Sequence, residues 1–282
     1  VCLDSFQTGR KENLRHLSRE PRFDLVEADV TDPLPPRLGV RHLRMDAVFN
    51  LACAASPPQY QADPEHTMLT NVLGTRNLLR LAEASGARFL QASTSEVYGD
   101  PESHPQAETY WGHVNPTGPR ACYDEGKRAA EALSFDFGRA GRVDARVARI
   151  FNTYGPNMDP DDGRVVSNFV VQALRGHDIT LHGDGGQTRA FCYVDDLVEG
   201  LMRLMAADDH PGDVVNLGNP VETTVLALAQ RVVELCGSPS TITCHPLPQD
   251  DPRRRCPDIA RARAALHWSP RIDLDTGLAR TI

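Results

Sequence analysis

Apolar residues recur along the first half of the chain with two alternating spacings. Runs of strand length are expected at residues 1–4, 23–29, 45–52, 87–92 and 143–150. Between them, residues 67–85 and 121–140 carry apolar side chains at helical intervals. Strands that alternate with helices indicate a parallel sheet with helices on both faces. The pattern therefore predicts an α/β fold built on a doubly wound parallel sheet.

The pattern becomes less regular after Asn152. Loops rich in proline and glycine separate shorter expected helices at 164–175, 194–206 and 223–236. We therefore predict two domains. A sheet domain occupies residues 1–152, and a smaller α/β domain occupies residues 153–282, with some of its segments returning to the sheet.

Composition narrows the function without naming it. The 282 residues are 40% hydrophobic and carry a net charge of −8, which argues against nucleic acid as a partner. Apolar stretches fall short of the ~20 residues that a membrane helix needs, so no membrane partner is expected. The seven cysteines form no CxxC pair and the histidines no HExxH, so no metal is expected. Free thiols are typical of a reducing cytoplasm.

Lysine is rare in this chain, since only Lys11 and Lys127 stand among 30 basic residues. Such a bias towards arginine favours a bacterial origin with a GC-rich genome, and we expect a cytoplasmic protein. A retained lysine is also a place to look for chemistry that arginine cannot perform.

Lys127 belongs to a pattern with chemical meaning. Tyr123 and Lys127 are four residues apart and share one face of an expected helix. A tyrosine there can act as a general base if its pKa falls from about 10 towards neutrality. A lysine ammonium and an oxidised nicotinamide nearby would favour the tyrosinate. The spacing of Tyr123 and Lys127 alone also occurs by chance, so the neighbouring motifs determine whether it marks a functional site.

Three expected strands end in polar residues. Thr94, Ser95 and Glu96 follow the strand at 87–92, Asp4 ends the first strand, and Asp29 ends the second. Ligands bind parallel sheets at this edge, and an acid at a strand end suits the diol of an adenosine ribose. Asp29 could accept from the adenine amine. Together these features predict a dinucleotide site.

Long motifs extend this picture. They lie at residues 94–128, 148–169, 187–200, 216–220 and 250–259. In these stretches the chain resembles the extended short-chain dehydrogenase/reductases that act on nucleotide sugars, and within them the UDP-glucuronate decarboxylases. The resemblance implies a Rossmann-type NAD-binding domain at 1–152, a domain mainly for the sugar nucleotide at 153–282, and NAD as the cofactor.

The resemblance also assigns roles to residues. Catalysis falls to Thr94, Ser95, Glu96, Tyr123 and Lys127. Besides Tyr123 and Lys127, the cofactor would contact Asp4, Ser5, Phe6, Thr8, Gly9, Asp29, Val30, Leu51, Ala52, Cys53, Thr70, Ala92 and Thr153. The UDP-sugar substrate would contact Asn152, Arg164, Asn168, Arg189 and Arg254 or Arg255. Arginine suits phosphate because its guanidinium forms bidentate hydrogen bonds.

One departure from the family concerns the start of the chain. The family begins with a strand and a GxxGxxG loop that receives the cofactor pyrophosphate. No such loop precedes Asp4. From the usual spacing between the glycines and the acid, this first strand and loop, roughly 20–30 residues, are expected to be missing before Val1.

The implied reaction is decarboxylation of UDP-glucuronate to UDP-xylose with recycled NADH. Tyr123 would take the proton of the 4-hydroxyl as hydride moves to NAD, and the resulting ketone lies beta to the carboxylate and permits loss of carbon dioxide. A 4,6-dehydratase typically has Asp-Glu where this chain has Ser95-Glu96. Ser95 leaves room for a substrate carboxylate, and Glu96 could relay a proton at carbon 5. A dTDP- or UDP-hexose 4,6-dehydratase and a 4-epimerase remain alternatives.

Two further interpretations concern activity and assembly. A non-catalytic NAD-binding protein would keep the sheet and lose the tyrosine, the lysine or the substrate arginines, all of which are present here. The expected helices at 67–85 and 121–140 keep apolar residues on more than one face, and similar proteins pair these helices. We therefore expect a homodimer.

Overall fold

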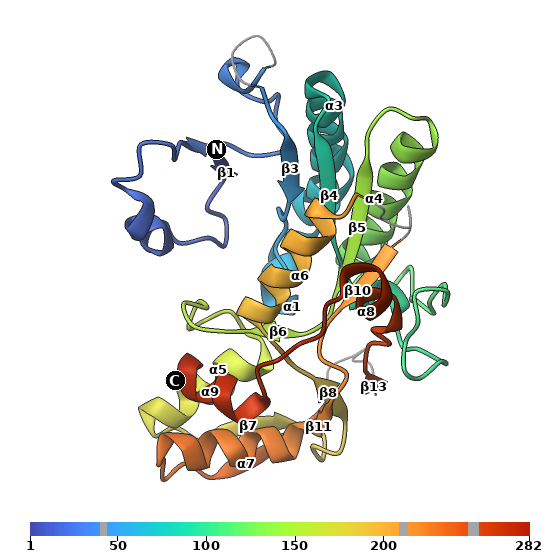
Figure 1. The fold of residues 1–282 in the computed structure, drawn as a ribbon. Helices are drawn as coiled ribbons and strands as arrows, with labels where there is room; N and C mark the ends of the chain where they lie inside the picture. Colours follow the sequence, from blue (N-terminus) through green and yellow to red (C-terminus); the bar gives the residue numbers. More distant parts are fainter. Residues whose placement is uncertain (40–43, 209–213, 248–253) are drawn as a thin grey trace.

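The computed structural model describes residues 1–39, 44–208, 214–247 and 254–282, which form a sheet lobe and a second, smaller lobe (Figure 1). The sheet lobe is built on four parallel strands in the order β10-β5-β4-β3. These are β3 (Ala47–Asn50), β4 (Arg88–Thr94), β5 (Ala145–Ile150) and β10 (Val214–Leu217). Nearly all of β4 and the first four residues of β5 are buried, and the polar side chains of Gln91 and Arg146 lie among their apolar residues. The predicted doubly wound α/β fold is thus confirmed.

Helices pack on both faces of this sheet. One face carries α1 (Pro57–Ala62), α2 (Pro64–Leu69), the π-helical turn η3 (Thr70–Gly74), α3 (Thr75–Ser85) and α4 (Ala121–Arg139). Leu79, Phe89 and Phe137 are buried in the core between α3, α4 and the strands. The opposite face carries α6 (Val194–Ala206) and α8 (Ala260–Leu266), over a core centred on Trp268.

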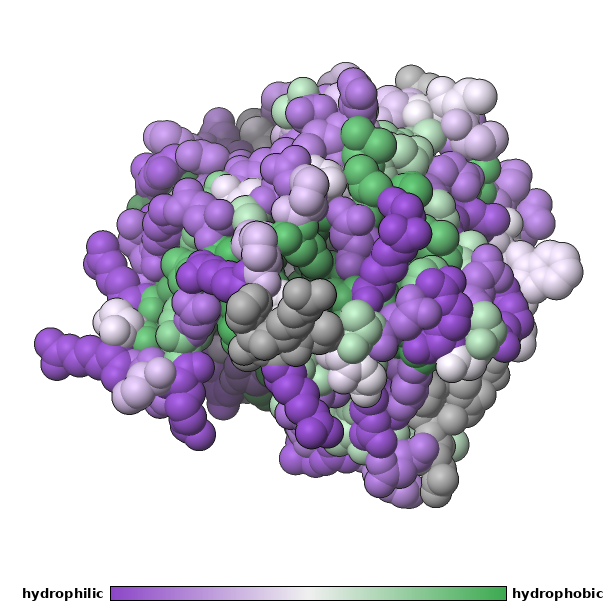
Figure 2. All heavy atoms as spheres, turned by 90° about the horizontal axis from the view of Figure 1, so that it is seen from above, coloured by the Kyte–Doolittle hydropathy of each residue, from purple (hydrophilic) through white to green (hydrophobic). Residues whose placement is uncertain are grey.

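The N-terminal segment forms a separate pair of strands. Here β1 (Cys2–Asp4) lies parallel to β2 (Leu25–Glu27), with the short helices η1 (Lys11–Leu17) and η2 (Pro36–Leu38) nearby. A cavity of about 750 Å³ lies between this pair and β3, and both contribute to its lining. Seen from above, apolar residues show on the surface among hydrophilic ones (Figure 2). The strand and glycine-rich loop expected before Val1 stay a prediction.

The second lobe holds most of the remaining elements (Figure 1). It contains β6 (Thr153–Tyr154), α5 (Val165–Arg175), β7 (Ile179–His182), β8 (Thr188–Ala190), β9 (Cys192–Tyr193), β11 (Glu222–Thr224), α7 (Val225–Cys236), β12 (Ile242–His245), β13 (Arg254–Arg255) and α9 (Leu274–Thr281). Small sheets join β7 to β12, β6 to β9, and β8 to β11 and β13. A separate apolar core holds α5 against α7.

The chain crosses between the lobes several times. The strand β10 pairs with β5 in the sheet lobe, and α6 and α8 also pack there. These segments come after residue 152 in the sequence but pack in the sheet lobe. The division at residue 152 stays a prediction. Residues 250–253, the first part of the motif at 250–259, lie outside the described residues.

Candidate functional site

The carboxyl end of β4 is followed directly by a short turn with polar residues. β4 ends at Thr94, and the 3₁₀ turn η4 (Ser95–Tyr98) begins at the next residue. The Thr94 hydroxyl accepts a hydrogen bond from the Glu96 amide at 3.2 Å. This cap turns the chain sharply and leaves Ser95 and Glu96 at the sheet edge, where parallel sheets bind ligands.

Tyr123 and Lys127 lie on the first turns of α4, beside this strand end. Both are buried, at 6% and 4% exposure. The Lys127 Nζ donates to the Ala92 carbonyl at 2.9 Å and lies 5.7 Å from the centre of the Tyr123 ring. Gly126 lets α4 pack closely against η3, since a Cβ there would lie 3.0 Å from Asn71 Nδ2. The helix therefore presents the pair to β4 as the spacing predicts.

The protein alone holds both groups towards their neutral forms. Burial raises the pKa of Tyr123, and a hydrogen bond with Thr94 opposes that rise only in part. Burial lowers the pKa of Lys127, with the nearby Cys53 and Glu131 opposing. A tyrosine pKa lowered towards neutrality is expected with an oxidised nicotinamide nearby, and for that complex it stays a prediction; in the chain by itself desolvation raises the pKa.

Glu96 is an ionised carboxylate held by two arginines. Its Oε2 accepts from Arg120 Nη2 at 2.7 Å, and its Oε1 accepts from Arg255 Nη1 at 2.7 Å. Burial alone would raise the pKa of Glu96, but the two guanidinium groups more than offset it and lower the pKa to about 2. Arg255 is contributed by β13, so the second lobe completes this ion cluster.

Two further side chains border Tyr123. The ring of Tyr60, from α1, stacks on that of Tyr123 with centroids 4.9 Å apart, and its hydroxyl is buried with no hydrogen-bond partner. Burial and the neighbouring Glu96 raise the pKa of Asp124 to about 8. The region around Tyr123 therefore combines dense ion pairs with buried polar atoms that a ligand could satisfy. We call Ser95, Glu96, Tyr123 and the two arginines the candidate reaction centre.

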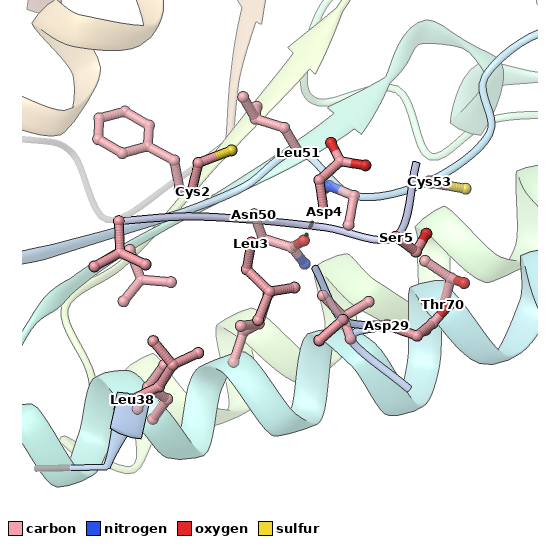
Figure 3. Close-up of a pocket in the computed structure, with 18 of the residues that line it drawn as sticks. Cys2, Leu3, Asp4, Ser5, Asp29, Leu38, Asn50, Leu51, Cys53 and Thr70 are labelled. Carbon is pink, nitrogen blue, oxygen red and sulfur yellow. Dashed lines mark hydrogen bonds between the residues drawn. The ribbon is translucent and has the colours of Figure 1, made fainter. Parts of the chain in front are cut away.

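The cavity beside β1 gathers most of the predicted cofactor residues. Its lining includes Asp4, Ser5, Thr8, Gly9, Asp29, Val30, Leu51, Ala52, Cys53 and Thr70. Figure 3 shows Asp4, Ser5, Cys53 and Thr70 towards one end, and Cys2 and Leu38 towards the other. The Thr70 hydroxyl is buried without a hydrogen-bond partner. The end of the cavity at Asp4, Ser5 and Thr70, its polar end, thus offers hydrogen-bonding groups.

Asp4 and Asp29 are held in place differently. The Phe6 amide donates to Asp4 Oδ1 at 2.7 Å. Asp29 accepts from the Thr31 amide at 2.8 Å and approaches His66 Nε2 at 2.8 Å. Burial would raise the pKa of Asp29, but the hydrogen bonds from Thr31 and His66 lower it overall.

Besides Tyr123 and Lys127, three predicted cofactor residues lie off the cavity lining. The Phe6 ring packs under Lys11, whose Nζ is 5.0 Å from its centre. Ala92 is buried and offers its carbonyl to Lys127. Thr153 lies on β6 and donates its hydroxyl to the Phe151 carbonyl at 2.9 Å.

The predicted substrate residues fall into two groups. Asn152 Oδ1 lies 3.5 Å from Arg255 Nη1, and Arg189 on β8 is the register partner of Arg255 on β13. Arg164 instead forms a bidentate ion pair with Asp162, at 2.6 and 2.9 Å. Asn168 donates to the Gly163 carbonyl at 3.0 Å and Arg254 is exposed, so these are not brought to the cluster. Their substrate roles stay predictions.

Sequence reasoning missed Arg120, Tyr60, Asp124 and His66. Arg120 precedes Tyr123 by three residues, and that spacing on one helix face is a signal that could have found it. Tyr60 and His66 are brought to the site only by tertiary packing. Among the described residues, no group of three or more metal-ligating side chains gathers, and no helix could span a membrane.

Comparison with known proteins finds relatives that share this sequence and fold. The chain is 55% identical over 282 residues to UDP-glucuronic acid decarboxylase 1 of Arabidopsis thaliana, covering 100% of this chain and 63% of that relative. It therefore spans less than two thirds of that curated relative's length. A dTDP-glucose 4,6-dehydratase structure from Streptomyces venezuelae with NAD bound superposes with a TM-score of 0.87 at 28% identity, over 99% of this chain and 84% of that one.

A second structure is similar to the same degree. UDP-glucuronic acid 4-epimerase from Bacillus cereus, in complex with UDP-glucuronic acid and NAD, gives a TM-score of 0.87 at 25% identity, over 99% of this chain and 88% of that one. Fold and site together define an extended short-chain dehydrogenase/reductase of the nucleotide-sugar class. The family model described as GDP-mannose 4,6 dehydratase matches residues 2–281, and the chain belongs to that family.

Proposed function

We propose that this protein decarboxylates UDP-glucuronate to UDP-xylose with NAD as a recycled cofactor. The observation that carries the proposal is the ionised Glu96, fixed by Arg120 and Arg255 beside the neutral Ser95 and close to Tyr123. The 55% identity to a UDP-glucuronic acid decarboxylase over the whole chain supports the same assignment.

The residues at the polar end of the cavity fit NAD. Asp4 at the end of β1 would hold the adenosine ribose, and Asp29 with Val30 would edge the adenine. Gly9 keeps a cradle open, since a Cβ there would lie 3.2 Å from Asp4 Oδ1. The unpartnered Thr70 hydroxyl supplies a further hydrogen-bonding group. When bound, NAD would supply a hydride acceptor for sugar carbon 4 and a positive charge at the nicotinamide.

Proton transfer falls to the chain's own side chains. Tyr123 would accept the proton of the sugar 4-hydroxyl, assisted by Thr94 and Lys127. Because the protein alone raises the pKa of Tyr123, ionisation is expected only in the ternary complex. After carbon dioxide leaves, Glu96 would relay a proton from water to carbon 5, because the resting carboxylate carries none of its own. The charge that Arg120 and Arg255 carry beyond that of Glu96 favours an anionic sugar nearby.

Ser95 separates this reaction from dehydration. A 4,6-dehydratase needs an acid to protonate the departing 6-hydroxyl, and a serine cannot serve as that acid. Ser95 is buried, at 3% exposure, and its small neutral side chain can hydrogen-bond a substrate carboxylate. An aspartate at this position would repel that carboxylate.

The first experiment incubates the full-length natural protein with UDP-glucuronate and catalytic NAD. Carbon dioxide release and product mass are followed together. A UDP-pentose with no net NADH supports the proposal, and a keto-pentose with stoichiometric NADH means an oxidative decarboxylase. Turnover only of a neutral hexose nucleotide to a 4-keto-6-deoxy sugar would favour the dehydratase.

The second experiment tests Ser95 directly. Ser95→Asp is expected to lower kcat/KM for UDP-glucuronate by 10-fold or more, roughly the effect of one unfavourable buried charge pair. Ser95→Thr, which keeps the hydroxyl, is the control. Intact decarboxylation by Ser95→Asp would show that the charge argument is wrong.

Two further expectations concern the oligomeric state and the cellular location. A homodimer would pair the helices at 67–85 with α4. Leu69 at the end of α2 is 41% exposed, and Leu133 and Phe135 on α4 are only half-buried. Analytical ultracentrifugation of the full-length protein tests this. A cytoplasmic location agrees with the seven free cysteines, and fractionation of the source cells tests it.

A further inference from the structure

Arg120 is a counter-ion of Glu96 and takes no part in the proton transfers of the proposed reaction. It is the residue before α4 begins, three residues ahead of Tyr123, and only 8% of it is exposed. Its Nη2 donates to Glu96 Oε2 at 2.7 Å. A buried guanidinium is costly unless an anion compensates it, so this contact is expected to matter for both partners.

The two oxygens of Glu96 are divided between two elements. Arg120 on the α4 side takes Oε2, and Arg255 on β13 takes Oε1. The Glu96 side chain is 14% exposed and its amide is capped by Thr94. The carboxylate therefore cannot rotate without breaking one ion pair, and its orientation depends on both arginines.

The charges around Glu96 show what Arg120 adds. Its titratable neighbours include Asp124 and Glu125 on α4, Tyr60 on α1 and Tyr123. Asp124 already holds a proton near neutral pH, because burial and Glu96 raise its pKa to about 8. Without Arg120, Arg255 alone would oppose the burial of Glu96, so the pKa of Glu96 would rise.

We propose that Arg120 is a positioning residue that keeps Glu96 ionised and correctly oriented beside Ser95 and Tyr123. This inference rests on the proposed function for its kinetic meaning. The link between Arg120 and the ionisation of Glu96 can, however, be measured without turnover.

The kinetic test compares Arg120→Met and Arg120→Lys with the full-length parent enzyme. Arg120→Met is expected to lower kcat by about 100-fold, as for a misplaced catalytic group. The acid limb of its kcat/KM profile should move up by about 1–3 pH units, because an opposite charge is lost. Arg120→Lys keeps that charge and should leave the acid limb in place. The control is Arg139→Met, on the exposed end of α4 where Arg139 pairs with Asp136.

The second readout is infrared spectroscopy of the carboxyl groups, with no substrate present. In a pH titration, the protonated-carboxyl band of Glu96, assigned by its loss in Glu96→Gln, should appear about 1–3 pH units higher in Arg120→Met than in the parent. An unmoved acid limb and an unmoved band would overturn the proposal. A rise confined to KM for UDP-glucuronate would also overturn it, since Arg120 would then bind substrate. Absence of decarboxylation by the parent enzyme would defeat the proposed function and leave the infrared test standing.

Discussion

The cavity beside β1 and the region around Tyr123 differ in how far their charged side chains are exposed to solvent. In the cavity beside β1, Asp29 contacts His66, and their side chains are 22% and 26% exposed. Around Tyr123, the side chains of Glu96, Arg120 and Arg255 are 14%, 9% and 8% exposed. Charges at the reaction centre are therefore desolvated and fixed before substrate arrives, whereas those of the cavity stay partly hydrated. Electrostatic effects should be large in the first region and small in the second.

The largest expected effect is at Tyr123. Tyr123→Phe removes the proton acceptor and keeps the ring that stacks on Tyr60, so kcat should fall by about 10³-fold. NAD affinity, set in the cavity, should change little. Single-turnover carbon dioxide release and calorimetric NAD titration measure the two effects. Tyr154→Phe, which removes a buried hydroxyl in the second lobe, is the control and should keep its activity.

The next effect is on stability and its dependence on pH. Glu96→Gln leaves Arg120 and Arg255 without their carboxylate, and breaking a buried pair costs about 3–5 kcal/mol of unfolding free energy. The pKa of Glu96 falls from an ordinary 4.5 to about 2 on folding. Its contribution is therefore full above pH 4.5 and is lost as pH falls towards 2.

Urea unfolding at a series of pH values measures both consequences. The variant should be less stable than the parent at pH 7, and its stability should depend less on pH between 4.5 and 2. Glu234→Gln removes an exposed partner of Arg231 and should cost about 1 kcal/mol at most. Equal slopes with pH in parent and Glu96→Gln would contradict the assignment of this ion cluster.

The comparison also explains what sequence could predict. Strand and helix positions followed from apolar spacing, and the expected helix at 194–206 matches α6 at both ends. Asp4 and Asp29 were predicted because they end expected strands; in the structure Asp4 ends β1, and Asp29 follows the end of β2 by two residues. The pairing of Glu96 with Arg255, 159 residues apart, could not be predicted because β13 reaches η4 only through tertiary packing. The π-helical turn η3 was likewise hidden, since helical spacing alone does not reveal one extra residue in a turn.

A third prediction, with a smaller expected effect, concerns Gly9 in the cavity. Gly9→Ala would place a Cβ 3.2 Å from Asp4 Oδ1, so the carboxylate must shift. We expect NAD to bind about 10-fold more weakly, with kcat at saturating NAD nearly unchanged, as for lost uniform binding. Gly138→Ala on α4 is the matched control, since its nearest neighbour would be 3.9 Å away. Equal NAD affinity in parent and Gly9→Ala would place the ribose elsewhere.

The smallest effect should come from His66. His66→Gln removes a partly hydrated partner of Asp29, an interaction worth about 0.2–1 kcal/mol, so NAD affinity should fall by only about 1.5- to 5-fold. The pKa of Asp29 should rise because one of the hydrogen bonds that lower it is lost, while those from Thr31 remain. The acid limb of NAD binding should therefore move to higher pH. A loss as large as that of Tyr123→Phe would show that the cavity is as desolvated as the reaction centre, and the contrast between the two regions would not hold.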